Sequence, residues 1–237
     1  MQTASALLEH LTTLENEQNR IGMARFGIAT TKALGISMPI LRGIARDVKA
    51  DAKKHQANPH AFRHTVAQEL WASRIHEAQL LAILIEDPQE MEPEQTESWV
   101  RDVNSWDMCD QLCGNLLWKM DYAKERMKSW CADDAEFVRR VGIVLIAQLA
   151  VHDKKATDAR FQDFFLILEQ YAYDERNFVK KAVNWSLRQL GKRSPVLLEQ
   201  AIVCAKRIAA QGTPGARWIA SNALREFAKL PADYFDT

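Results

Sequence analysis

The sequence has few cysteines and no long run of apolar residues. Four cysteines are spread over 237 residues, and none forms a C-x-x-C pair. Such sparse thiols do not make a disulfide framework, so we expect them to be reduced. The longest nearly apolar stretch, residues 141–151, contains Gln148 and is too short to cross a bilayer. We therefore predict no membrane-spanning helix and no association with a membrane.

The sequence also lacks the common short motifs of metal, nucleotide and hydrolase sites. No G-x-G-x-x-G, P-loop, G-x-S-x-G or H-E-x-x-H pattern occurs. Cys109 and Cys113 share a helical face and could join a metal site, but such cysteines are more commonly small buried residues. His60 and His64 have the same spacing without a third ligand. The first ten residues indicate an amphipathic helix rather than a signal peptide. We expect no metal, no organic cofactor and a cytoplasmic location.

The charges are unevenly distributed, although the formal net charge is zero. Residues 86–136 hold fourteen acidic against five basic residues, a balance of minus nine. Residues 176–229 hold eleven basic against two acidic residues, a balance of plus nine. A basic face attracts phosphates whatever the overall charge, so residues 176–229 are a candidate nucleic-acid surface.

The pattern of apolar residues predicts an all-α protein. Apolar residues recur every three or four positions nearly throughout, and no alternating run indicates a strand. This pattern gives about a dozen helices, and without a long Gly/Ser-rich linker we predict a single domain over residues 1–237. Helix breaks are expected at Ser37 to Pro39, Asn58-Pro59, Asp87-Pro88, Glu92-Pro93, residues 133–134, Asp174, Ser194-Pro195 and Gly212 to Gly215.

An internal repeat indicates how these helices are arranged. Residues 136–149 match residues 177–190 at an offset of 41, and a weaker match at an offset of 37 reaches residues 217–225. A period near 40 is typical of HEAT-like helical pairs, which stack because one pair cannot bury its own apolar face. We predict a curved solenoid of antiparallel helical pairs, an α-α superhelix. Arg139, Lys180 and Arg217 would form a basic row along its concave surface.

Four side chains stand out as a candidate site. Trp106 and Asp110 are four residues apart, which on a helix places an indole and a carboxylate on one face. Arg140 and Trp185 lie in the two related repeat segments, so stacked repeats could bring all four side chains to one surface. Each also has a structural interpretation: the tryptophans as core residues, Asp110 as an exposed carboxylate, and Arg140 as a partner of Glu136 one turn earlier.

A family resemblance supports the functional interpretation. It rests on Met23-Ala-Arg-Phe26, Leu34-Gly-Ile36 with Pro39, Glu69-Leu-Trp71, Ser105-Trp-Asp107 with Asp110, Arg140, and Lys181-Ala-Val-Asn-Trp185 with Leu187-Arg188. In this order and spacing the motifs, which cover almost the whole chain, resemble the AlkD-like family of DNA alkylation repair enzymes. These are HEAT-repeat glycosylases that excise alkylated purines.

The resemblance implies a role for each residue of the candidate site. Trp106 and Trp185 resemble the indoles that frame the lesion-bearing deoxyribose, Asp110 resembles the catalytic carboxylate, and Arg140 resembles the arginine at that site. Alkylation at N3 or N7 makes a purine a cationic leaving group, and a carboxylate stabilises the positive charge that develops on the sugar. We therefore expect hydrolysis of N3-methyladenine and N7-methylguanine in duplex DNA.

The residues around Trp185 are candidate DNA contacts. Lys181, Trp185 and Arg188 share one helical face, where basic side chains would flank the indole and meet phosphates. Lys180 and Arg217 occupy matching repeat positions, and they either contact DNA or only solvate the outer surface. We expect a monomer whose partner is duplex DNA with alkylated purines, without an obligate protein partner.

The chain departs from the family pattern at two positions. Phe26 stands where the glycosylases typically carry Tyr, so its aromatic contact with DNA would persist without a hydroxyl hydrogen bond. Ser105 stands where an additional Trp can precede the catalytic indole. The family also contains relatives that bind DNA without glycosylase activity. The alternatives are therefore a noncatalytic binder of damaged or branched DNA and a protein-interaction scaffold.

Overall fold

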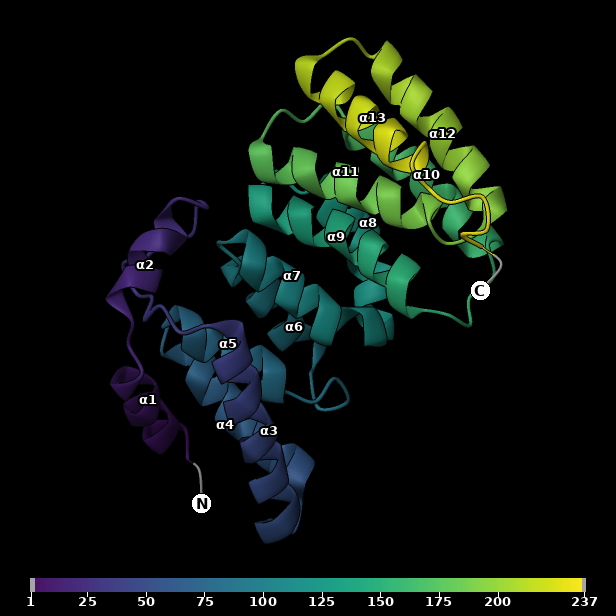
Figure 1. Cartoon of the computed structure of the whole chain (residues 1–237). Helices are drawn as coiled ribbons and strands as arrows, with labels where there is room; N and C mark the ends of the chain where they lie inside the picture. Colours follow the sequence, from purple (N-terminus) through teal and green to yellow (C-terminus); the bar gives the residue numbers. More distant parts are fainter. Residues whose placement is uncertain (1–2, 236–237) are drawn as a thin grey trace. The chain divides into compact units, whose positions relative to one another are not determined.

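The computed structural model describes residues 3–235, and every regular element in that range is helical. The chain forms thirteen α-helices and one short 3-10 helix there, and no strand, which confirms the all-α prediction. None of these helices is both long and apolar enough to span a membrane. The helices group into two compact units, residues 1–120 and 121–237 (Figure 1). The expectation of one continuous domain over residues 1–237 stays a prediction.

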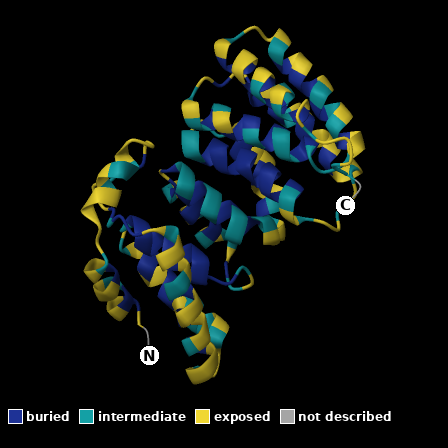
Figure 2. Ribbon diagram, in the orientation of Figure 1, coloured by how far each residue is buried: buried dark blue, intermediate teal, exposed yellow. Residues whose placement is uncertain are grey.

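Unit 1 contains seven α-helices and the 3-10 helix. They are α1 (Ala4–Thr13), α2 (Glu17–Ala24), α3 (Met38–His55), α4 (Pro59–Ala72), α5 (His76–Ile85), α6 (Pro93–Asp102), α7 (Trp106–Asn115) and η1 (Leu117–Lys119). Helix α5 packs against α3, α4 and α7, and all ten of its residues are buried. It is therefore the central helix of unit 1, and α3 runs past it to an exposed C-terminal end (Figure 2).

The predicted breaks coincide with helix boundaries, and at some of them a side chain satisfies free N–H groups at the helix start. The Asn58 side chain accepts from the N–H groups of His60 and Ala61 at the start of α4. Ser194 accepts from the Leu197 N–H at the start of α12 (Pro195–Ala210), with Pro195 in the first position, as predicted. The sequence pattern did not mark the breaks at residues 14–16, 73–75, 103–105, 116–120 and 153–158.

Unit 2 contains three successive helical pairs. They are α8 (Asp121–Ala132) with α9 (Glu136–His152), α10 (Ala159–Tyr171) with α11 (Asn177–Gly191), and α12 with α13 (Pro214–Phe227). Helix α11 packs against both α9 and α13, and α10 packs against α12. The second helices of the pairs thus lie side by side as one layer (Figure 1). This is the stacking that the repeat predicted.

One aromatic contact and two hydrogen bonds join neighbouring helices of that layer. The rings of Phe137 and Phe178, which match at the offset of 41, lie 5.3 Å apart. The Ser186 hydroxyl donates to the Ile143 carbonyl at 2.7 Å. The Asn184 amide donates to the Ile219 carbonyl at 3.0 Å. Because each bond joins α11 to a neighbouring repeat, these polar side chains fix the register of the stack.

The expectation that Arg139 belongs to an accessible basic row with Lys180 and Arg217 is wrong. Its side chain is buried, Nη1 donates to Asp174 Oδ2 at 2.6 Å, and Nε donates to the Cys131 carbonyl at 3.1 Å. The guanidinium also lies over the Tyr171 ring, 5.2 Å from its centroid. Arg139 therefore holds α9 to the end of α10 and does not join Lys180 and Arg217 on an accessible surface.

Candidate functional site

The segment between α2 and α3 is fixed by a buried carboxylate. Glu77 has no exposed surface, and its two oxygens accept from the N–H groups of Leu34 at 2.7 Å, Gly35 at 2.7 Å and Ile36 at 3.3 Å. Gly35 has φ +77°, and a Cβ there would lie 2.1 Å from the Asn16 carbonyl oxygen. The turn therefore needs glycine, and it wraps its N–H groups around one anionic group.

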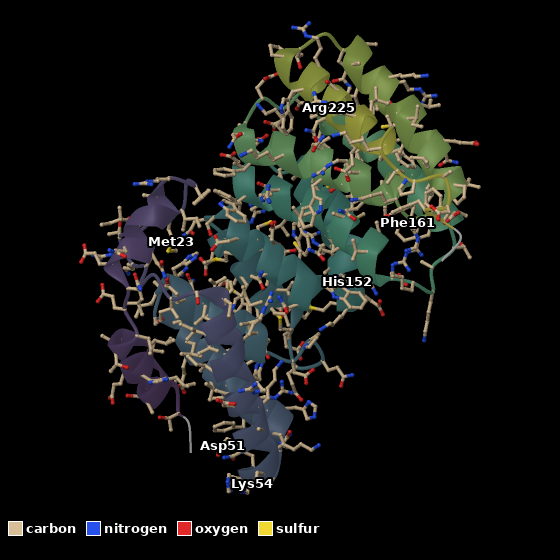
Figure 3. All side chains as sticks on the ribbon, in the orientation of Figure 1. Met23, Asp51, Lys54, His152, Phe161 and Arg225 are labelled. Atoms are coloured by element: carbon tan, nitrogen blue, oxygen red, sulfur yellow. The ribbon has the colours of Figure 1, made fainter. Side chains whose placement is uncertain are left out.

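Helix α7 places Trp106 and Asp110 on one face. Both are half-buried, whereas Met108 and Cys109 between them are fully buried in unit 1. The Trp106 indole N–H donates to the Phe26 backbone carbonyl at 3.1 Å. That carbonyl belongs to the segment that follows α2, whose last turn contains Met23 (Figure 3). The predicted pairing of indole and carboxylate on one helix face is confirmed, and the indole is also anchored to the loop.

The two departures from the family pattern have different environments. Phe26 is 68% exposed, and its backbone carbonyl accepts the hydrogen bond from Trp106. The ring therefore remains available for an aromatic contact. Ser105 is fully buried at the N-cap of α7. A tryptophan would not fit there without repacking, because a buried site of hydroxymethyl size cannot accept an indole.

Asp107, the residue after Trp106 on α7, forms a charged pair with His76 on α5. His76 Nε2 is 2.8 Å from Asp107 Oδ2, and His76 is buried. Burial would raise the pKa of Asp107, but the hydrogen bond and charge of His76 outweigh it and lower that pKa. Burial would lower the pKa of His76, but the Asp107 hydrogen bond and charge, with the Glu77 charge, raise it. Both shifts favour the imidazolium–carboxylate form.

Arg140 in unit 2 is held against the start of α11. Its Nη1 donates to the Phe178 carbonyl at 2.6 Å, and Arg140 is buried. Glu136, one turn earlier on α9, accepts from the Phe178 N–H at 3.3 Å. Both α9 side chains therefore bind the backbone of the same α11 residue, which fixes the position of the guanidinium.

Trp185 and Lys181 lie on one face of α11. Trp185 is half-buried, and its indole N–H has no hydrogen-bond partner in residues 3–235. Lys181, one turn earlier, is exposed and forms no ion pair within the same range. A tryptophan N–H and an ammonium without protein partners are both available to a ligand.

The other three basic candidates already have protein contacts. Arg188 pairs with Glu226, which also binds Lys192 Nζ at 2.7 Å. Lys180 Nζ lies over the Trp218 ring, 5.4 Å from its centroid. Arg217 is exposed, and its Nη1 donates to the Gly212 carbonyl at 2.6 Å. Lys181 is therefore the basic residue of this group with the most freedom to bind phosphate.

Sequence reasoning missed an exposed aromatic residue on unit 2 and a buried carboxylate in unit 1. Trp218 is 40% exposed and stands at the offset of 37 from Lys181, so the weaker repeat match could have indicated a second aromatic on this face. Glu77 follows His76 shortly before the apolar run of residues 80–85, with no local sign of its partners. No group of three or more His, Cys, Asp or Glu suited to a metal ion occurs within residues 3–235.

The structure describes the predicted site residues in two groups. Unit 1 carries Phe26, Trp106 and Asp110, and unit 2 carries Arg140 and Trp185 with their basic neighbours. The expectation that the two indoles, Asp110 and Arg140 share one surface stays a prediction.

Comparisons with known proteins identify the fold and the family of the chain. A solved structure described as a new family of proteins related to the HEAT-like repeat DNA glycosylases, with affinity for branched DNA structures, is similar, with a TM-score of 0.74. The sequences are 17% identical, and the match covers 95% of each chain, so the fold is HEAT-like. No curated protein sequence matches significantly. The family model described as DNA alkylation repair enzyme matches residues 7–227. This chain therefore belongs to the DNA alkylation repair enzyme family.

Proposed function

We propose that the protein is a DNA glycosylase that hydrolyses the N-glycosidic bond of cationic N3- and N7-alkylated purines in duplex DNA. The observation that carries this proposal is the face of α7 on which Trp106 and Asp110 lie together, with the indole anchored to the Phe26 carbonyl. Membership of the DNA alkylation repair enzyme family supports it.

Asp110 is the proposed catalytic residue. When the C1′–N9 bond of 7-methyldeoxyguanosine breaks, the electron pair leaves with the neutral purine and the sugar becomes an oxocarbenium ion. Water then adds to C1′, and its proton passes to Asp110 or to solvent. Opposite unit charges about 4 Å apart at an effective dielectric near 20 attract by roughly 4 kcal/mol, nominally about a thousandfold in rate. One fixed carboxylate can therefore supply much of the acceleration.

The aromatic and basic side chains have binding roles in this proposal. The Trp106 face attracts the cationic sugar and base by cation–π contact, worth on the order of 1 kcal/mol or more when water is excluded. On unit 2, Trp185 is proposed to make the same kind of contact, Lys181 to bind the DNA backbone, and Arg188, Lys180 and Arg217 to add phosphate contacts. The buried Arg140, expected to bind DNA, is proposed instead to hold the start of α11 in place beneath that surface. Phe26 is proposed as an aromatic contact with DNA.

The test is single-turnover release of 7-methylguanine from a defined duplex. We expect release by the wild type, a loss of about a thousandfold in Asp110→Asn, and no effect of a chelator. Asp163→Asn on α10 is the matched control, since this exposed carboxylate is remote in sequence from every candidate residue. Release that is undiminished in Asp110→Asn would remove the catalytic role from this carboxylate.

A second candidate function is noncatalytic binding of branched DNA. It is favoured by the similar solved structure, whose description gives that protein affinity for branched DNA structures. The same preparation distinguishes the two functions: a protein that binds a four-way junction more tightly than a matched duplex and releases no base fits the binder. Indifference to both DNAs at low salt would favour the protein-interaction scaffold.

A further inference from the structure

A cavity in unit 1 has the chemistry of an anion site. It has a volume of about 350 Å³ and is lined by one small residue, Ala29, and six polar side chains. These are Thr31, Lys32, Arg74, His76, Gln79 and Asn104. Each of the six can donate a hydrogen bond, two are permanently cationic, and no carboxylate lines the cavity.

Gln79 is the strongest sign that the cavity is built for a ligand. It is 3% exposed and lines the cavity, yet its side-chain amide forms no hydrogen bond to any residue in 3–235. Its amide atoms are not among the fully buried side-chain atoms that lack a partner, so they are accessible from the cavity. Because most side-chain amides on residues this buried are hydrogen-bonded within the protein, this amide is available to a ligand in the cavity.

His76 contributes a buried donor from the same helix. Its Nε2 is held by Asp107 at 2.8 Å, and its Nδ1 has no partner among the described residues. In the imidazolium form, which the contact with Asp107 favours, both ring nitrogens donate. One N–H is thus fixed by the protein, and the other remains for a ligand in the cavity.

The two permanent cations complete the lining. Lys32 is exposed and has no ion pair in the described part of the chain. Arg74 has φ +60° in the left-handed region, which disfavours residues with a Cβ, and its Nη1 is fixed to Asp102 Oδ1 at 2.6 Å. Asp102 is itself held by the Trp71 indole N–H at 2.9 Å. The guanidinium is therefore held in place, while the ammonium is free to move onto a ligand.

The cavity lies beside Trp106. Asn104 precedes Trp106 by two residues, and the segment whose Phe26 carbonyl accepts from the indole continues into Ala29 and Lys32. A backbone bond from His76 N–H to the Lys32 carbonyl at 2.9 Å fixes this segment to α5. The cavity and the Trp106 face are therefore parts of one rigid local arrangement within unit 1.

We infer that this cavity binds one phosphate group of the DNA strand, next to the nucleotide that Trp106 contacts. A phosphate presents several acceptor oxygens in different directions and carries negative charge, which matches amide, hydroxyl, imidazolium, ammonium and guanidinium donors. The anion chemistry follows from the cavity alone. The assignment of the phosphate to DNA rests on the proposed function.

The test follows the Gln79 side-chain amide by NMR. The probes are inorganic phosphate, the dinucleotide TpT with a single phosphodiester, its uncharged methylphosphonate analogue, and a short undamaged duplex. We expect TpT and the duplex to shift the Gln79 amide signal and the methylphosphonate to leave it in place. No base release is needed, so a failed glycosylase assay leaves this measurement intact.

Two variants and a control make the test specific. Gln79→Leu removes the amide at similar volume and breaks no hydrogen bond within residues 3–235, so the free energy of unfolding should change little. Gln79→Leu and Lys32→Ala should each weaken TpT binding by roughly tenfold, the size of a lost hydrogen bond to a charged group. Lys54→Ala, an exposed lysine near the end of α3 (Figure 3), should have no effect.

Two results would overturn the inference. A Gln79 amide that none of the four probes moves would show that the cavity binds no phosphate. A signal that inorganic phosphate shifts, but neither TpT nor the duplex does, would make it a site for free phosphate and remove the assignment to DNA.

Discussion

The indole N–H of Trp106 donates to the backbone carbonyl of Phe26, 80 residues earlier in the chain, at 3.1 Å. The orientation of the candidate indole thus depends on a loop backbone rather than on the exposed Phe26 ring. The phenyl ring and the carbonyl of one residue therefore have separable roles.

Trp106→Phe and Phe26→Ala should separate these roles. Trp106→Phe keeps an aromatic ring but loses the hydrogen bond, and we expect single-turnover base release to slow by about threefold to tenfold. Phe26→Ala keeps the carbonyl, so it should weaken duplex affinity while leaving the rate at saturating protein close to that of the wild type. A Phe26→Ala variant with normal affinity and a slow rate would contradict this assignment.

Loss of the Glu77 carboxylate should destabilise unit 1. Glu77→Gln places an amide where one carboxylate accepts three backbone N–H groups, and we expect a loss of about 2 to 3 kcal/mol in the free energy of unfolding. Urea denaturation measures it, and Glu125→Gln, at an exposed position on α8, is the matched control. Equal midpoints for the two variants would show that the turn does not need the charge.

Gly142 and Gly43 should respond to alanine in opposite directions. A Cβ at Gly142 would lie 2.5 Å from the Cys131 nitrogen, where α9 crosses α8, so Gly142→Ala should cost about 1 to 3 kcal/mol. A Cβ at Gly43 in α3 meets nothing within 4 Å, so Gly43→Ala should stabilise by about 0.5 to 1 kcal/mol. The comparison requires only thermal unfolding, and a stabilised Gly142→Ala protein would refute the close approach of the helices.

The pair of His76 and Asp107 should make stability depend on pH. The lowered pKa of Asp107 gives stability that is present above about pH 4 and is lost as pH falls through the folded-state value. The raised pKa of His76 gives stability that is present below about pH 6.5 and is lost as pH rises through its folded-state value.

Asp107→Asn tests this window by urea unfolding at two pH values. Its loss of unfolding free energy relative to the wild type should be larger near pH 5 than near pH 8, because the variant leaves a buried imidazolium without a counter-charge at the lower pH. For Asp163→Asn the difference should be the same at both pH values. If the loss of unfolding free energy in Asp107→Asn were also the same at both pH values, His76 would be neutral from pH 5 to pH 8.

Lys181 and Arg188 should contribute unequally to DNA binding. Lys181 has no ion pair in residues 3–235, whereas Arg188 is paired with Glu226. Lys181→Ala should therefore weaken duplex binding and reduce the slope of log affinity against log salt by about one. Arg188→Ala should change both the affinity and the slope less. Glu226→Gln should strengthen duplex binding, because it frees Arg188 from its ion pair. Fluorescence anisotropy over a salt series gives all three values.

The helices and the repeat could be predicted because both leave a regular pattern in the sequence. The apolar period marked the helices, and the match at an offset of 41 appears as α9 and α11 lying side by side, with Phe137 against Phe178. The shared face of Trp106 and Asp110 followed from the same geometry, since four residues span about one helical turn.

Ion pairs and hydrogen bonds between residues distant in sequence could not be predicted from such local patterns. Arg139 and Arg140 form an adjacent basic pair that matches Lys180 and Lys181, and the pattern therefore placed Arg139 on the surface. Its partner Asp174 lies 35 residues later, and no local spacing encodes that pairing. The anchoring of Trp106 by a backbone carbonyl has no signal in side-chain identity at all.

The Glu77 contact also determines when unit 1 can become ordered during synthesis. The three N–H groups of the Gly35 turn lie 41 to 43 residues before the carboxylate that binds them. When this turn has emerged from the ribosome, α5 has not yet followed. The N–H groups of the turn then have no carboxylate to which they can donate. We expect the turn to stay open until Glu77 emerges, and the Phe26 carbonyl to receive its indole only after α7 has followed. Ribosome-bound chains truncated before and after Glu77 would therefore differ in the protease sensitivity of residues 25–37.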